Sequence, residues 1–124
     1  MATSSAGFHE AEEHLTLGTR DMHRALASLM EELEAVDWYQ QRIDVTGDDE
    51  LRAILEHNRD EEKEHAAMVL EWIRRNDPIF EARLREYLFT EGPIVGREAV
   101  LMNRDGAVRR REPSVSVGSL RGGG

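Results

Sequence analysis

The sequence predicts an all-α protein: an antiparallel two-helix hairpin plus a short third helix, with two chains pairing into a four-helix bundle. Apolar residues recur three and four positions apart along two long stretches, which is the period of an amphipathic helix. A short segment rich in Asp, Gly and Thr, residues 44–50, separates these stretches. Two amphipathic helices cannot enclose a core, so the hairpin needs a second copy, and a homodimer on a two-fold axis is the simplest solution.

The composition fits one small helical domain. The chain has 124 residues, of which 40% are hydrophobic and 33% charged, and it contains no cysteine. The absence of cysteine excludes thiolate ligands and disulfides and is compatible with a reducing compartment. We expect no membrane span, because no apolar run is long enough, and no signal peptide, because the N-terminus lacks a basic start followed by an apolar core.

The charge of the chain is concentrated in its first part. The net charge is −9, and residues 1–76 hold 18 acidic and 8 basic residues. Such an acidic body argues against nucleic acid and anionic membranes as partners and favours cations. For most of these acids, a solvated surface that keeps the protein soluble is the simpler interpretation.

The first helix is expected from near His9 to about Ile43, after a flexible N-terminus at residues 1–8. Its stripe steps by four and three through Met22, Leu26, Leu29, Leu33, Val36, Gln40 and Ile43. Gly18 weakens the first turns by up to about 1 kcal/mol relative to alanine. The periodicity therefore predicts one long amphipathic helix before the turn.

The second helix is expected from Gly47 or Asp48 to Arg75. Thr46, with Asp49 three residues later, resembles a capping box, and Asn76 suits a left-handed C-terminal cap. The seam of this helix steps by four and three positions through Leu51, Leu55, Asn58, Glu62, His65, Val69 and Trp72. A carboxylate and an imidazole thus occupy positions where leucines would be expected.

A third helix is expected over residues 78–89. Asp77 as N-cap and Pro78 at the first helical position form a start signal, and residues 90–93 end the helix. Residues 94–103 could add another turn or two. The helical domain thus spans residues 9–98, and the Arg-, Gly- and Ser-rich residues 99–124 are expected to form a flexible tail.

Glu62 and His65 indicate a metal site. Three residues apart on a helix, they point to the same side, and burying an unpaired carboxylate costs several kcal/mol. Glu32 lies beside the first helix's stripe, at roughly the same height in the hairpin. Di-iron bundles take one Glu from each of two helices and Glu-x-x-His from each of the other two, so one chain holds half of this ligand set.

Two chains would complete the set and hold two metal ions per dimer. Mixed carboxylate and imidazole ligands suit iron or manganese, with zinc as a non-redox competitor. The alternative is that the Glu-x-x-His pair lies on an ordinary solvated helix face. A single Glu-x-x-His pair on a helix usually lies on such a solvated face, but here the pair falls on the apolar seam.

Three segments resemble the encapsulated ferritins, which are ferritin-like iron oxidases carried inside bacterial encapsulin shells. They are residues 31–39 (EELEAVDWY), residues 57–68 (HNRDEEKEHAAM) and residues 87–93 (YLFTEGP). The resemblance covers roughly residues 20–93. It implies a ring, typically a decamer of five dimers, located in the bacterial cytoplasm inside an encapsulin nanocompartment.

The resemblance also implies roles for individual residues. It gives the di-iron ligands as Glu32, Glu62 and His65, an iron entry site as Glu31 and Glu34, and residues close to the iron as Trp38 and Tyr39, with Tyr39 counted as catalytic. It suggests a secondary cation site, for a metal such as calcium, at His57, Glu61 and Glu64. For the acids outside the centre, ordinary helix-surface residues remain the alternative. We assign no role to His9, His14 or His23.

The tail carries a second resemblance. Residues 114–121 look like the peptide by which cargo docks inside encapsulin shells. The residues concerned are Val115, Val117, Gly118, Ser119, Leu120 and Arg121. Their alternation around Gly118 fits a short extended peptide in an apolar groove of the shell protein. A disordered C-terminus is the alternative.

The predicted function is a ferroxidase that uses O₂ to oxidise Fe(II) to Fe(III), which is then mineralised and stored inside the shell. Two other classes stay open. One is a structural or adaptor bundle whose polar seam residues fix register. The other is a rubrerythrin-like di-metal enzyme acting on peroxide, against which the absence of cysteine speaks mildly.

Overall fold

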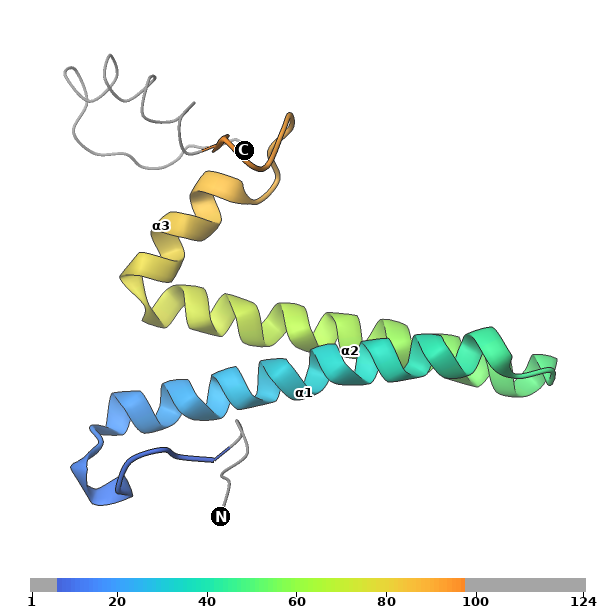
Figure 1. Ribbon diagram of the computed structural model, residues 1–124, viewed down its shortest axis with the longest axis horizontal. Helices are drawn as coiled ribbons and strands as arrows, with labels where there is room; N and C mark the ends of the chain where they lie inside the picture. The colour runs from blue at the N-terminus through green and yellow to red at the C-terminus, as the bar shows by residue number, and fades with distance from the viewer. Residues whose placement is uncertain (1–6, 98–124) are drawn as a thin grey trace. The chain divides into compact units, whose positions relative to one another are not determined.

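A computed structural model describes residues 7–97, and they contain helices and no strand (Figure 1). A short 3₁₀ helix, η1 (Glu12–His14), precedes three α-helices: α1 (Leu17–Val45), α2 (Asp49–Asn76) and α3 (Pro78–Tyr87). Helices α1 and α2 run antiparallel side by side (Figure 1). The all-α prediction of a hairpin and a short third helix is confirmed. None of the described helices combines the length and apolar character that crossing a membrane requires.

Helix α1 begins at Leu17, so the prediction of helix from near His9 is wrong. Thr16 has extended backbone, with ψ of 160°, and its side chain accepts a hydrogen bond from the Thr19 N–H at 3.1 Å. This cap satisfies one of the free N–H groups of the first turn. The helical spacing of apolar residues extends further towards the N-terminus, but the cap at Thr16 fixes the start of the helix at Leu17.

The residues before α1 are attached to it by side chains. The Arg20 guanidinium donates to the Glu12 carbonyl oxygen at 2.7 Å, and the Phe8 ring lies 4.5 Å from the His23 ring between centroids. Residues 1–6, most of the predicted flexible N-terminus, lie outside the described residues. The segment from Phe8 to Thr16 is therefore held on the first turns of α1.

The connection between α1 and α2 is capped by Asp48, whereas the sequence suggested Thr46. The Asp48 carboxylate accepts from the Leu51 N–H at 2.8 Å. A carboxylate also interacts favourably with the positive end of the helix dipole, which a hydroxyl does not. Thr46 instead accepts from the Asp48 N–H at 3.2 Å, and its carbonyl receives a hydrogen bond from the Arg52 side chain.

The end of α2 also differs from expectation. Asn76 stays helical, and its side-chain amide donates to the Trp72 carbonyl oxygen at 2.8 Å. The next residue, Asp77, is extended, with φ −145° and ψ 107°, because the residue before a proline is disfavoured in helical conformation. The predicted left-handed cap at Asn76 is therefore wrong, and the Asp77–Pro78 break is confirmed.

The residues from Pro78 onward form a second unit. Helix α3 ends at Tyr87, earlier than predicted, and the Thr90 hydroxyl donates to the Tyr87 carbonyl oxygen at 2.8 Å. Phe89 has a left-handed backbone, with φ 59°, which stops the helix. Residues 98–124 lie outside the described residues. They include most of the predicted extension at 94–103 and the whole tail.

Few side chains are fully covered in the hairpin. The buried apolar residues are Ile43, Ala66 and Ile73, with Ile73 0% exposed. Ile43 was predicted, but the seam of α2 placed Leu51 and Trp72 inside, and both are exposed. A straight helix drifts by about 20° per heptad from a 3.5-residue repeat, so the buried stripe moves from Trp72 to its neighbour Ile73.

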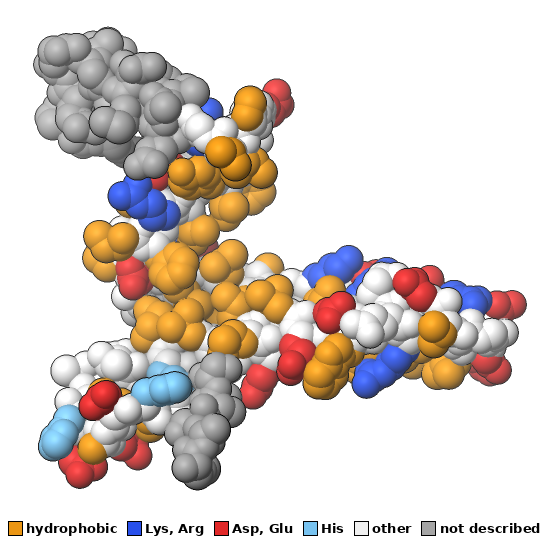
Figure 2. Space-filling model, viewed as in Figure 1, with side chains coloured by type: hydrophobic (Ala, Val, Ile, Leu, Met, Phe, Trp, Pro, Cys, Tyr) orange, Lys and Arg blue, Asp and Glu red, His pale blue; other side chains and the backbone are white. Residues whose placement is uncertain are grey.

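Many apolar side chains remain exposed on the two long helices. They are Leu17, Leu26, Met30, Leu33, Trp38, Val45, Leu51, Ile54, Met68 and Trp72. Figure 2 shows hydrophobic side chains at the surface along the hairpin. A single hairpin therefore leaves part of its amphipathic stripe uncovered, as expected if a second chain completes the bundle.

Candidate metal centre

Three ligand side chains meet between α1 and α2. Glu32 comes from α1, and Glu62 and His65 come from α2. One ligand atom from each lies within 4.8 Å of the other two. Within residues 7–97, this is the one group of at least three such side chains with this geometry. The structure thus brings together the three residues that the sequence selected.

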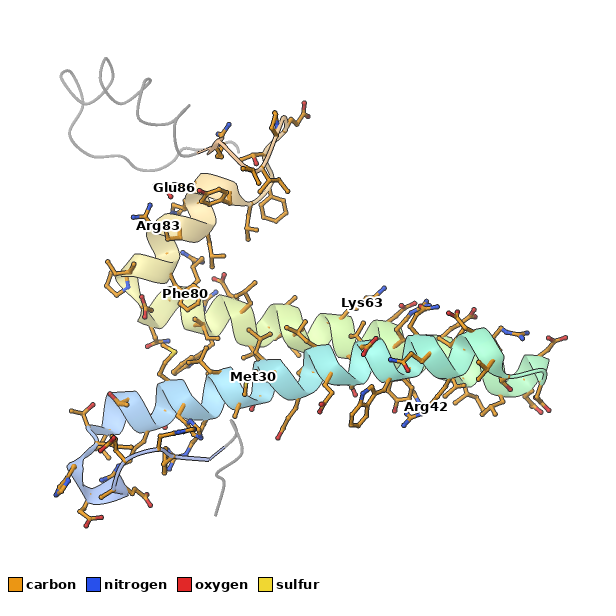
Figure 3. All side chains as sticks on the ribbon, viewed as in Figure 1. Met30, Arg42, Lys63, Phe80, Arg83 and Glu86 are labelled. Carbon is orange, nitrogen blue, oxygen red and sulfur yellow. The ribbon has the colours of Figure 1, made fainter. Side chains whose placement is uncertain are left out.

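The helix geometry explains the arrangement. His65 Nδ1 lies 3.3 Å from Glu62 Oε1 on the same helix and 3.6 Å from Glu32 Oε1 on the facing helix. The side chain of Lys63, labelled in Figure 3, points away from α1. Glu62 and His65, three residues apart, share the side of α2 that faces α1. His65 Nδ1 is therefore the ring nitrogen turned towards both carboxylates.

The cluster is only partly covered by its own chain. The side chains of Glu32, Glu62 and His65 are 24%, 23% and 43% exposed. Two carboxylates at this depth repel each other when both are ionised, and a cation is one way to relieve this repulsion. Carboxylate oxygens together with an imidazole nitrogen form a donor set that suits iron, manganese or zinc. The residues present therefore fit a metal.

The hydrogen bonds of the cluster change its proton affinities. A hydrogen bond with Glu62, together with partial burial, raises the pKa of Glu32, and the same hydrogen bond lowers the pKa of Glu62. The pKa of His65 is raised, chiefly by its hydrogen bond with Glu62. In the metal-free cluster, Glu32 and His65 thus hold a proton more tightly than usual, whereas Glu62 holds one less tightly, and a bound cation competes with these protons.

Tyr39 and Trp38, predicted to lie close to the iron, follow Glu32 along α1. Tyr39 is half-buried, and the Arg42 guanidinium lies 5.6 Å from the centroid of its ring. Trp38 is exposed. The single chain thus presents an aromatic pair on α1 beyond the cluster, with the Tyr39 ring covered on one face by a cation.

The acids assigned to further sites lie mostly on the surface. Glu31 and Glu34 are exposed on α1, and His57 and Glu64 are exposed on α2. Glu61 instead contacts the cluster, with its Oε1 atom 4.0 Å from His65 Nε2. The entry site and the secondary cation site remain predictions. The targeting residues of the tail, Val115 to Arg121, lie outside the described residues.

Two contacts near the cluster were not predicted from the sequence. One is the contact of Glu61 with His65, whose signal is their spacing of four on one helix. The other is a hydrogen bond across the hairpin from Arg59 Nη1 to Gln40 Oε1 at 2.9 Å. Neither the apolar stripes nor the Glu-x-x-His spacing predicts a hydrogen bond between these two residues, so only the structure shows it.

The fold and the cluster define a helical hairpin that carries a candidate carboxylate–histidine metal site. The family model described as EncFtn-like matches residues 7–91, and the chain belongs to this family. The resemblance to the encapsulated ferritins is therefore confirmed.

Several relatives are close. The chain is 54% identical over 130 residues to an encapsulated ferritin-like protein of Rhodospirillum rubrum, covering 98% of this chain and 93% of that protein. It is 60% identical over 87 residues to a ferritin-like protein of Thermotoga maritima, covering 70% and 76%. It is 39% identical over 101 residues to the encapsulin nanocompartment cargo protein EncC of Myxococcus xanthus, covering 73% and 76%.

A solved structure has the same fold. The crystal structure of protein ne0167 from Nitrosomonas europaea superimposes with a TM-score of 0.70 at 64% sequence identity. The match covers 71% of this chain and 97% of that one. The helical hairpin is thus the architecture of an experimentally determined relative.

Proposed function

We propose that the protein is a ferroxidase that binds two Fe(II) ions between two chains and passes their electrons to O₂. The observation that carries this proposal is the convergence of Glu32, Glu62 and His65 from two helices within 4.8 Å. The ferritin-like names of the relatives support an iron-related role for the protein. Iron is the substrate here, and it leaves as Fe(III) for mineralisation.

The centre needs a second chain. One hairpin offers two carboxylates and one imidazole, and its ligand side chains are still partly exposed. A two-fold dimer would double this set to four carboxylates and two imidazoles, the full complement of a di-iron bundle. The exposed apolar residues of α1 and α2 would be covered in the same contact. The resemblance further implies that five such dimers form a ring.

Each ligand has a distinct task in this proposal. The carboxylates of Glu32 and Glu62 offset the cation charge and favour Fe(III) over Fe(II), which promotes electron loss to O₂. Neutral His65 donates through Nδ1, after releasing the proton that Glu62 helps it to hold. Glu31 and Glu34 would attract hydrated Fe(II) to the outside of the centre, and Tyr39 would hydrogen-bond a ligand or a bound water.

The test is to remove one carboxylate and to measure iron binding and oxidation separately. In Glu62→Ala, we expect Fe(II) oxidation in air to slow by at least about a hundredfold, because a ligand of the shared centre is lost. Anaerobic native mass spectrometry should show two irons per pair of chains, and none at this centre in the variant.

Glu56→Ala is the matched control, since Glu56 is exposed on the same helix. It should keep the rate and the iron count. An unchanged oxidation rate in folded Glu62→Ala would contradict the assignment of the site. Iron binding without oxidation by O₂, but with turnover of peroxide, would favour a rubrerythrin-like enzyme instead.

We further propose that the protein works as cargo inside an encapsulin shell, to which residues 114–121 attach it. The names of two relatives, one encapsulated and one an encapsulin cargo, support this role, and the match to the first spans 98% of this chain. The enclosed mineral would then be stored by the shell, because a bundle this small has no storage cavity.

The targeting proposal is tested by co-expression with the shell protein. Deleting residues 113–124 should abolish loading while leaving iron oxidation intact. Replacement of the same residues by a glycine–serine segment of equal length is the control for chain length, and it should also fail to load. Retained loading in either variant would overturn the targeting role.

A further inference from the structure

Glu61 faces the outer nitrogen of the His65 ring. Glu61 Oε1 lies 4.0 Å from His65 Nε2, while Nδ1 of the same ring lies 3.3 Å from Glu62. The two residues are one helical turn apart on α2, a spacing at which side chains meet. The ring therefore lies between an inner pair of carboxylates and one outer carboxylate.

The chemistry of imidazole explains what the contact of Glu61 with His65 Nε2 could do. A neutral imidazole has one nitrogen that accepts and one that carries hydrogen. If Nδ1 gives its lone pair to a metal, Nε2 must carry the hydrogen, and its direction then depends on an acceptor. Ligand histidines of this kind almost always donate their second N–H to a carboxylate, a carbonyl or water.

Glu61 also had another assignment, the secondary cation site with His57 and Glu64. The structure favours the contact with His65, because His57, Glu61 and Glu64 form no three-ligand group within the described residues, whereas Glu61 is in ion-pair range of the ring. The side chain of Glu61 is 50% exposed, so it can close the remaining distance to hydrogen-bond length without breaking a buried contact.

We propose that Glu61 is a positioning residue of the metal centre: it accepts the Nε2–H of His65 and so holds Nδ1 towards the ion bound by Glu32 and Glu62. This rests on the proposed function of the centre. The carboxylate fixes the tautomer and the ring direction and makes the imidazole a stronger donor. It does not touch the iron itself.

The test uses Zn²⁺, which binds such ligands without redox chemistry. Zinc affinity is measured by competition with a chelator, and Glu62→Ala identifies the binding that belongs to this centre. We expect Glu61→Ala to weaken zinc binding about tenfold, the lower end of the effects known for such partners. Glu61→Gln should lie nearer the wild type, because its amide oxygen still accepts the hydrogen bond.

The matched control is Glu56→Ala, which removes the same charge from an exposed position on the same helix. It should leave zinc affinity unchanged. A second readout is the nuclear magnetic resonance signal of the His65 Nε2–H in the zinc-loaded protein. It should be visible in the wild type and Glu61→Gln and lost to solvent exchange in Glu61→Ala.

Three results would overturn the inference. Wild-type affinity and an unchanged Nε2–H signal in Glu61→Ala would show that Glu61 does not hold the ring. Equal weakening in Glu56→Ala would show that net charge is responsible. If Glu62→Ala binds zinc as the wild type does, the centre itself is wrong, and the proposed function fails together with this inference.

Discussion

The two ends of the α1–α2 hairpin are held together by different interactions. Near the turn, polar side chains cross between the helices or onto the connection: Arg59 donates to Gln40, and Arg52 donates to the Thr46 carbonyl oxygen. Gln40 in turn donates to Asp44 at 2.9 Å. This end also buries Ile43.

At the open end, the helices are joined mainly by apolar contact. Ile73 is fully buried and Ala66 is nearly so. A shallow groove of about 410 Å³ lies alongside, lined by Asp21, Arg24, Ala25, Ser28, Val69 and Trp72. The ion pairs of Arg24 with Asp21 and of Arg74 with Glu71 at this end each lie within one helix.

The cluster of Glu32, Glu62 and His65 lies between these two ends, and the difference between the ends explains what each contributes. Hydrogen bonds are directional, so the bond from Arg59 to Gln40 restricts how α1 can slide along α2. Apolar burial is not directional and supplies stability without selecting one register. The position of Glu32 opposite Glu62 thus depends on the turn end, and the cohesion of the hairpin depends on the open end.

The largest effect is expected from emptying the open end. Ile73→Ala should lower the free energy of unfolding by about 2–4 kcal/mol, because it removes a fully buried side chain and leaves a cavity. Chemical denaturation at one fixed chain concentration measures this, since pairing of chains adds to stability.

The control for Ile73→Ala is Val45→Ala at the turn, where the side chain is 83% exposed. It should change the free energy of unfolding by less than about 0.5 kcal/mol. A similarly small loss in Ile73→Ala would contradict the view that the open end provides the cohesion of the hairpin.

A smaller effect on stability is expected from the titration of His65, in the cluster between the two ends of the hairpin. The hydrogen bond with Glu62 raises the pKa of His65 above its ordinary value of 6.5. The stabilisation from protonated His65 is therefore fully present below pH 6.5 and is lost as pH rises through the pKa of the folded state. The metal-free protein should lose this stability at higher pH, whereas zinc affinity should rise, because the ion needs neutral imidazole.

This dependence is measured from denaturation midpoints of the metal-free protein between about pH 6 and pH 8. That pH interval covers the range where histidine titrates. His65→Asn should flatten the dependence, since asparagine does not titrate. An identical slope in the two proteins would show that the cluster does not link protons to folding.

The smallest change in stability is expected at the turn end. Arg59→Met and Gln40→Leu should each cost less stability than Ile73→Ala, because the bond is partly exposed to water. Both should weaken zinc binding, since the register of α1 against α2 becomes less defined. The double variant should bind zinc no more weakly than either single variant, because both remove the same bond across the hairpin, and the other bonds of these residues, to Asp60 and Asp44, each lie within one helix.

Arg24→Met is the comparison for this pair, since the Arg24–Asp21 ion pair lies within α1 and does not cross the hairpin. Zinc affinity should be unaffected in it. Additive losses from Arg59→Met and Gln40→Leu would mean that the two residues act independently and do not set the register together.

The local sequence determined the helices, the break between them and the three ligand residues. A helix has a fixed period, so the stripe through Leu55, Glu62 and Val69 already shows which side of α2 faces a partner. The restart at Asp77–Pro78 is equally local, because proline restricts its own backbone and that of its neighbour. Glu32 could be matched to Glu62 because a short turn makes the two helices antiparallel.

The tertiary structure decided what depends on competition or on distance across the hairpin. Asp48 caps α2 in place of Thr46. Helix α1 begins at Leu17, after the cap at Thr16, because one local hydrogen bond outweighs the apolar periodicity that extends towards the N-terminus. Ile73 is buried in place of Trp72 because small angular drifts accumulate along a helix. The hydrogen bond of Arg59 with Gln40 joins two helices at residues that no sequence pattern pairs, so only the packing of α1 on α2 could reveal it.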